Sequence, residues 1–203
     1  MRLFKAFKRS VRDERGSISV EAILMFPMLA WAFMAMFVFF EGLRESNITL
    51  KATYTVADLL SREADPDDPL TEDDLVGMNA IYAWLTRSTE PVQLRVSVVR
   101  YDAATNSHIR IWSRGVNGKQ DLQQQDIASV VTPHVPIMAD ATNAIIVETW
   151  AEYDPVVDMG LTETDLYNIV VTSPRFAGQL MLEGVGDGGG SAHDDGTDEN
   201  NSI

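Results

Sequence analysis

No cysteine occurs among the 203 residues of the chain. The protein therefore forms no disulfide, offers no thiolate to zinc and has no cysteine nucleophile. Basic residues are also few, since 16 Lys and Arg stand against 30 Asp and Glu and leave a net charge of −14. Proteins that bind nucleic acid neutralise its phosphates with lysine and arginine. We therefore expect no nucleic-acid partner for this chain.

Sequence motifs that mark enzymes are missing as well. The chain has neither a Gly-x-Ser-x-Gly elbow nor a P-loop. None of the three histidines, His108, His134 and His193, stands beside a nucleophile in a pattern typical of catalysis. The acidic pairs at 67–68 and 73–74 fall where helix caps and turns are expected. The sequence thus predicts no catalytic residue, no metal site and no cofactor, and we expect that the protein is not an enzyme.

Charge is absent from one long stretch, residues 22–40, in which Pro27 is the only helix breaker and is expected to kink the helix. As a helix with a rise of about 1.5 Å per residue, this stretch would be roughly 28 Å long, which is close to the roughly 30 Å of a hydrocarbon core. A cleavable secretory signal has a shorter apolar core and a small-residue cleavage site. An apolar surface on all sides argues against an ordinary amphipathic core helix. The stretch therefore predicts a transmembrane helix over 17–40.

The charge on either side of this helix predicts its orientation. Residues 1–16 carry six basic and two acidic side chains, a formal charge of +4, which leaves −18 for the rest of the chain. The positive-inside rule places such a leader in the cytoplasm. We therefore expect a single-pass protein of the bacterial inner membrane, with a cytoplasmic N-terminus and a periplasmic C-terminal domain.

Three features at the start of this helix occur together: Glu14-Arg15-Gly16, Val20-Glu21-Ala22, and Pro27 six residues after the glutamate. With them, the first 60 residues resemble the TadE-like pseudopilins of the tight-adherence (Flp) pilus assembly system. A weaker similarity extends to residues 147–153 and 173–176. The resemblance implies a pilin-like fold and a role in pilus assembly.

The resemblance also implies processing and partners. A prepilin peptidase would cleave between Gly16 and Ser17, so that Glu21 becomes the fifth residue of the mature chain. An ionisable residue in a membrane segment usually has a partner, and the new amino group on Ser17 would supply one. A second interpretation is that the Glu21 side chain reaches the cytoplasmic headgroups. Further implied partners are other pilins and pseudopilins, platform proteins of the Tad system, and membrane lipid.

The rest of the sequence predicts an α+β domain. The membrane helix is expected to continue to residue 62 and to be followed by a helix that Thr71 caps and that ends near residue 88. Alternating patterns predict strands at 92–102, 108–114, 143–153 and 166–172, and a short helix is expected at 122–131. Such an order of elements favours a long helix packed on a small, mainly antiparallel sheet. The expected regions are a leader (1–16), a transmembrane helix (17–40), a periplasmic domain (41–182) and a disordered acidic, Gly-rich tail (183–203).

Two patterns predict which side chains share a face, and one face of the long helix is expected to pack on its own domain while the other is available to partners. In the helix after residue 40, one expected apolar face comprises Leu43, Leu50, Tyr54 and Ala57, and the other comprises Ile48, Ala52 and Leu59. In the strand at 108–114, Ile109 and Ile111 are expected on one face, with Arg110 and Trp112 on the other.

Three classes of function remain open from the sequence. The first is an assembly protein of the pseudopilin or minor-pilin kind, whose membrane helix is the interaction module. The second is an uncleaved bitopic scaffold whose periplasmic domain binds the secretion machinery. The third is an unrelated anchored binding protein. Cleavage after Gly16 would favour the first class.

Overall fold

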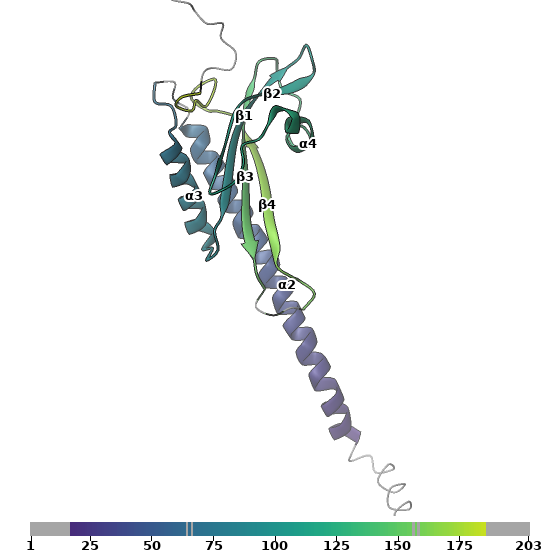
Figure 1. The fold of residues 1–203 in the computed structure, drawn as a ribbon. Helices are drawn as coiled ribbons and strands as arrows, with labels where there is room; N and C mark the ends of the chain where they lie inside the picture. The colour runs from purple at the N-terminus through teal and green to yellow at the C-terminus, as the bar shows by residue number, and fades with distance from the viewer. Residues whose placement is uncertain (1–16, 64, 66, 156, 158, 186–203) are drawn as a thin grey trace, which may run out of the picture. The chain divides into compact units, whose positions relative to one another are not determined.

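The computed structural model describes residues 17–63, 65, 67–155, 157 and 159–185 (Figure 1). The expected leader with Gly16 and residues 186–203 of the expected tail lie outside the described residues. The elements in chain order are α2 (Ser17–Arg62), α3 (Glu72–Thr86), β1 (Gln93–Asp102), β2 (Ser107–Val116), the 3₁₀ turn η2 (Gln124–Asp126), α4 (Ile127–Val130), β3 (Asn143–Tyr153) and β4 (Thr164–Thr172). The α+β class and the long first helix are confirmed.

The chain divides into two compact units. The first unit combines residues 1–45 with residues 153–164, and the second combines residues 46–152 with residues 165–203. Helix α2 contributes its N-terminal part to the first unit and its C-terminal part to the second.

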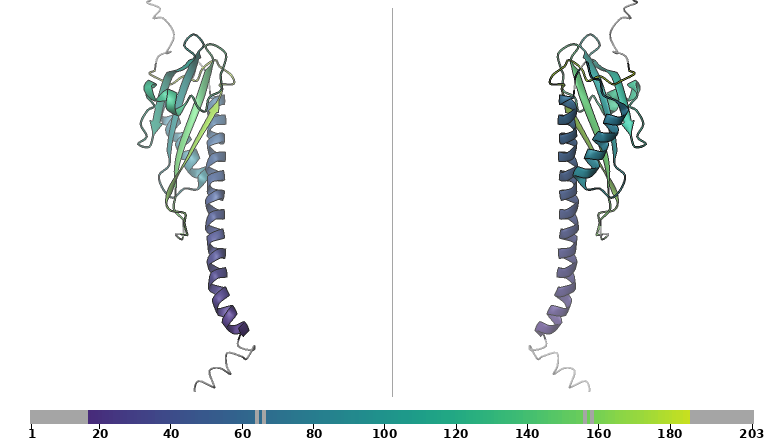
Figure 2. Two further views of the ribbon diagram at one scale, coloured as in Figure 1. Left: turned by 90° about the vertical axis from the view of Figure 1, so that its right-hand side faces the viewer. Right: turned by 90° about the vertical axis from the view of Figure 1, so that its left-hand side faces the viewer.

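In the second unit, four strands form an antiparallel sheet in the order β2-β1-β3-β4. Strand β1 pairs antiparallel with β2 on one side and with β3 on the other. The C-terminal part of α2 and helix α3 cover one face of this sheet, and α4 lies on the opposite face (Figure 2). The two faces bury separate apolar clusters, the larger one beneath the two long helices.

Helix α3 begins where its sequence predicts. Thr71 is the N-cap, and its hydroxyl accepts a hydrogen bond from the backbone N–H of Asp74, while the Asp74 carboxylate accepts one from the backbone N–H of Thr71. This reciprocal capping box satisfies two backbone donors that a helix start otherwise leaves open. Leu75 and Tyr82 are fully buried, and Trp84 is exposed.

The expected apolar faces of α2 are confirmed in part: Ala52 and Ala57 are buried, whereas Leu43 and Tyr54 are exposed. The buried face also contains side chains that the pattern did not include, most of them small or β-branched: Thr49, Thr53, Val56, Leu60 and Ser61. Small side chains let the helix approach the sheet closely, and the Thr53 hydroxyl lies 2.7 Å from that of Thr149 on β3. Because both hydroxyls are satisfied, the polar side chains can be buried at little cost.

The expected alternation in β2 is also wrong beyond Arg110. The register places Trp112 opposite Val98 and Arg110 opposite Val99, so that Ile111 is an extra residue, a β-bulge. The bulge resets the alternation, and Ile111 and Trp112 both belong to the larger apolar cluster. The Trp112 indole N–H donates to the Leu180 carbonyl at 2.8 Å, which satisfies its polar atom inside the core.

Candidate functional site

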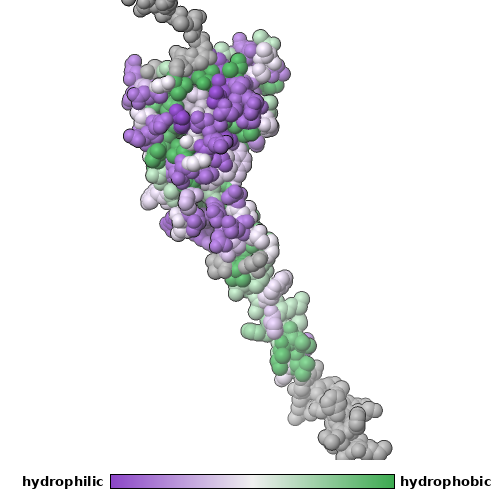
Figure 3. Space-filling model, in the orientation of Figure 1, coloured by the Kyte–Doolittle hydropathy of each residue, from purple (hydrophilic) through white to green (hydrophobic). Residues whose placement is uncertain are grey.

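The first candidate site is the surface of α2 over residues 18–40, here called the apolar helix surface. Side chains that elsewhere form protein cores are exposed along it, among them Phe26, Trp31, Phe33 and Phe40. Apolar residues dominate the visible face of this part of the helix (Figure 3). An apolar surface this large on a protein marks contact with a membrane or with another apolar chain. By length and composition, α2 is the one helix within the described residues that could cross a membrane.

The residues predicted to matter for processing and assembly lie at the start of α2. Ser17 is its first residue, whereas Gly16 lies outside the described residues. The Glu21 side chain is exposed, and no described cation forms an ion pair with it. Pro27 lies inside the helix, which continues through it. The structure therefore presents Glu21 as an acidic side chain on an otherwise apolar surface.

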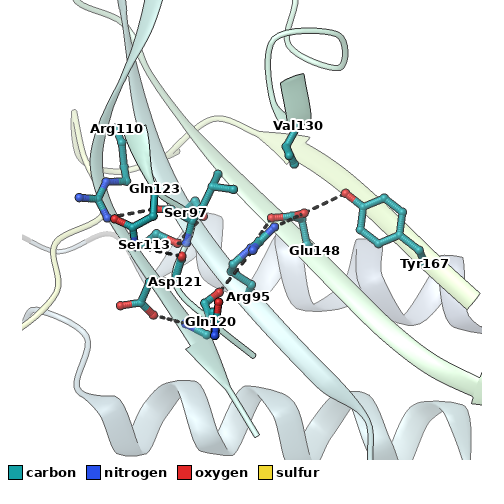
Figure 4. A network of polar contacts seen from close by, with 12 residues as sticks. Arg95, Ser97, Arg110, Ser113, Gln120, Asp121, Gln123, Val130, Glu148 and Tyr167 are labelled. Carbon is teal, nitrogen blue, oxygen red and sulfur yellow. Dashed lines mark hydrogen bonds and ion pairs between the residues drawn. The ribbon is translucent and has the colours of Figure 1, made fainter. Parts of the chain in front are cut away.

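The second candidate site is a polar cluster on the sheet face opposite the long helices (Figure 4). Glu148 on β3 is fully buried, and its carboxylate accepts two hydrogen bonds from the Arg95 guanidinium on β1, at 2.6 and 2.7 Å. The hydroxyl of Tyr167 on β4 donates to the same carboxylate at 2.8 Å. Burial, the Glu148 charge and this hydrogen bond raise the pKa of the Tyr167 phenol.

Aromatic and cationic groups extend this cluster toward the solvent. The Trp150 ring lies 5.2 Å from the Tyr167 ring, and the Lys119 ammonium lies 3.7 Å from the Trp150 ring centroid. Trp150 and Tyr167 border a shallow depression of about 380 Å³, which His134 also lines. Because both carboxylate oxygens of Glu148 already accept hydrogen bonds, the arrangement ties β1, β3 and β4 together rather than holding a free base.

Sequence reasoning did not predict this cluster. Arg95 and Glu148 both belong to strands that were predicted, Arg95 between Leu94 and Val96 and Glu148 directly after Val147. The feature of the sequence that could have predicted the pair is one basic and one acidic residue, each within a predicted strand, which can pair if the two strands are neighbours. Pairing them requires the β1–β3 register, which places Arg95 opposite Glu148 and which the sequence alone does not supply.

Potential metal sites were also sought among the described residues. Within that part of the chain, no three His, Asp or Glu side chains come close enough together to hold a metal ion. Comparison with protein-family models, with curated proteins and with solved structures finds no match to this chain.

Proposed function

We propose that the protein is a pseudopilin-like or minor-pilin-like assembly protein of a tight-adherence pilus, anchored in the bacterial inner membrane by α2. The observation that carries this proposal is the apolar helix surface, where most side chains of residues 18–40 are exposed and a carboxylate, Glu21, lies near the start. A bilayer would cover this surface before assembly, and neighbouring apolar helices would cover it afterwards. The small residues Ala22, Ala30, Ala32 and Ala35 would allow such helices to approach closely.

Glu21 gives the proposed assembly step its specificity. A carboxylate is costly inside hydrocarbon and is favoured next to a cation. Cleavage after Gly16 would create an amino group on Ser17, about one helical turn from Glu21. The amino terminus of a neighbouring subunit would pair with the carboxylate in the same way. The packed state would thereby be favoured over any arrangement of helices that leaves the charge alone.

The amino terminus of the mature protein tests the proposal. We expect mass spectrometry of protein purified from its native membrane to find a chain that starts at Ser17. A chain that starts at Met1 would favour an uncleaved bitopic scaffold instead, because the leader would remain attached and the Ser17 amino group would not form.

Two substitutions separate processing from assembly. We expect Gly16→Leu to leave the leader attached, because a bulky side chain would block the cleavage site. We expect Glu21→Ala to permit membrane insertion and cleavage but to impair pilus formation, since the charge pair is lost. Glu41→Ala, which removes a carboxylate outside the uncharged run, is the matched control and should assemble normally. If the Glu21→Ala variant formed normal pili, the proposed pairing of Glu21 with an amino terminus would be wrong.

A further inference from the structure

The segment 153–164, which connects β3 to β4, packs against α2 within the first unit. Its contact point is Gly42, where an added Cβ would lie 3.3 Å from a Leu161 methyl and 3.6 Å from the Tyr153 ring. One turn earlier, Val38 is only 3% exposed, whereas Phe37 and Phe39 on either side of it are about half exposed. Protein therefore covers one side of α2 at the level of residues 38–42.

That level coincides with the end of the uncharged run. The run ends at Phe40, and the first charged side chain after it is Glu41. If α2 crosses the bilayer, as the proposed function requires, Gly42 lies about 3 Å beyond the last apolar residue. The segment that packs on Gly42 then lies at the depth of the lipid headgroups, where tyrosine and half-buried apolar side chains are favoured.

The side chains of the segment suit this depth. Pro155, Val157, Met159 and Leu161 are all half-buried, so each keeps some apolar surface exposed. Acidic side chains lie near Tyr153, and burial together with the charges of Glu41, Glu45 and Asp154 raises the pKa of Tyr153. Carboxylates at this level repel anionic lipid and attract the cationic group of a zwitterionic lipid.

We propose that the segment 153–164 is a second membrane-contacting element, which rests in the headgroup layer of zwitterionic phospholipid and fixes the depth of α2. The proposal depends on the proposed membrane anchoring of α2. It adds a lipid contact made by a segment more than 100 residues later in the chain.

Site-directed spin labelling of the full chain in phosphatidylethanolamine–phosphatidylcholine nanodiscs tests this proposal. The chain has no cysteine, so a single introduced cysteine carries the only label. Three positions are compared: Phe33→Cys on the apolar helix surface, Met159→Cys in the segment, and Ala104→Cys at the exposed β1–β2 turn. Collision rates of the nitroxide with oxygen and with a water-soluble nickel chelate report its depth.

We expect the nitroxide at position 33 to collide mainly with oxygen and the nitroxide at position 104 mainly with the nickel chelate. At position 159 we expect a collision rate with the nickel chelate severalfold lower than at position 104, while the nitroxide remains accessible to oxygen. We also expect Leu161→Asn to shift the collision rates of the label at position 159 toward those at position 104. Gly42→Ala is the control: its Cβ needs only a small shift of the Leu161 side chain, so the collision rates at position 159 should not change.

The possible failures are distinguishable. Nickel accessibility at position 159 equal to that at position 104, with position 33 still in hydrocarbon, would overturn the headgroup contact and leave the anchor intact. Low accessibility of position 159 to both reagents would mean burial by protein and would also overturn the contact. Nickel accessibility at position 33 would overturn both the contact and the membrane anchoring on which it depends.

Discussion

Glu148 is a fully buried carboxylate, and its partners come from two other strands. Removal of one member of a buried ion pair leaves the other charge without a partner, which typically costs about 3–5 kcal/mol. We therefore expect Glu148→Ala to lower the free energy of unfolding of the full chain by roughly this amount. Urea unfolding in detergent, followed by tryptophan fluorescence, measures the change.

The double variant Arg95→Met/Glu148→Leu is the control for this prediction. Because apolar side chains of similar volume replace both charges, it should be less destabilised than Glu148→Ala alone. Equal losses in the single and double variants would mean that packing, rather than an unpaired guanidinium, determines the cost of the single substitution.

His108 on β2 predicts a dependence of stability on pH. Its ring is buried beside Tyr101, and its Nε2 has no hydrogen-bond partner among the described residues. Burial lowers the pKa of this imidazole below its usual value. Below a pH of about 6.5 the unfolded chain therefore binds a proton more readily than the folded chain does, and the free energy of unfolding decreases as the pH decreases. This contribution to stability is fully present above the unfolded pKa and is lost as the pH falls through the folded pKa.

The variant His108→Phe keeps an aromatic ring beside Tyr101 and removes the titration. We expect urea unfolding midpoints of the wild-type protein to decrease more between pH 7.5 and 5.5 than those of the variant, a range of about one pH unit on each side of the usual histidine pKa. Equal decreases would assign the pH dependence to other groups.

Among the elements, the end of β2 depends on a glycine. A Cβ added at Gly115 would overlap the backbone oxygen of Lys119, and backbone cannot move aside as a flexible side chain can. The Gly115 N–H also donates to the Asp121 carboxylate at 2.8 Å, which fixes the turn that follows. We expect Gly115→Ala to destabilise the protein by about 1–3 kcal/mol, because the strand end and the turn must separate.

Gly77 is the matched control for this substitution. It lies in α3, and an added Cβ would meet no atom within 4 Å. Alanine in an exposed helix position is favoured over glycine by roughly 0.5–1 kcal/mol, so Gly77→Ala should raise the unfolding midpoint while Gly115→Ala lowers it. A loss of stability in both variants would contradict the assignment of the clash to Gly115.

The elements whose cause is local could be predicted from the sequence. Thr71 and Asp74 predict the start of α3 because a capping box involves only neighbouring residues. The apolar alternation of 143–153 predicts β3 with its observed bounds. The buried face of α2 could be predicted only in part, because close packing on the sheet selects small polar side chains such as Thr49 and Thr53 over Tyr54. The bulge at Ile111 depends on pairing with β1, which local pattern does not determine.

At the scale of the whole molecule, the sequence divides at residue 40 into an uncharged and a charged part, whereas the compact units divide at residue 45. The difference arises because the segment 153–164 packs on α2 beyond the apolar run. Hydropathy along the chain cannot reveal such a contact, since the two segments are more than 100 residues apart. Only the fold brings them together.

The distribution of charge over the whole chain predicts its orientation in the membrane. Positive charge close to a membrane helix sets the side on which that end remains, whereas acidic side chains contribute little. We expect a variant with glutamine at all six basic positions of the leader to lose its fixed orientation; these positions are Arg2, Lys5, Lys8, Arg9, Arg12 and Arg15. Alkaline phosphatase fused to the C-terminus, which is active only outside the cytoplasm, should be fully active on the wild-type chain and much less active on the variant.

The control for this prediction exchanges Arg and Lys with each other at the same six positions, which keeps the charge and should preserve full phosphatase activity. Full activity in the glutamine variant would mean that the positive leader does not determine the orientation.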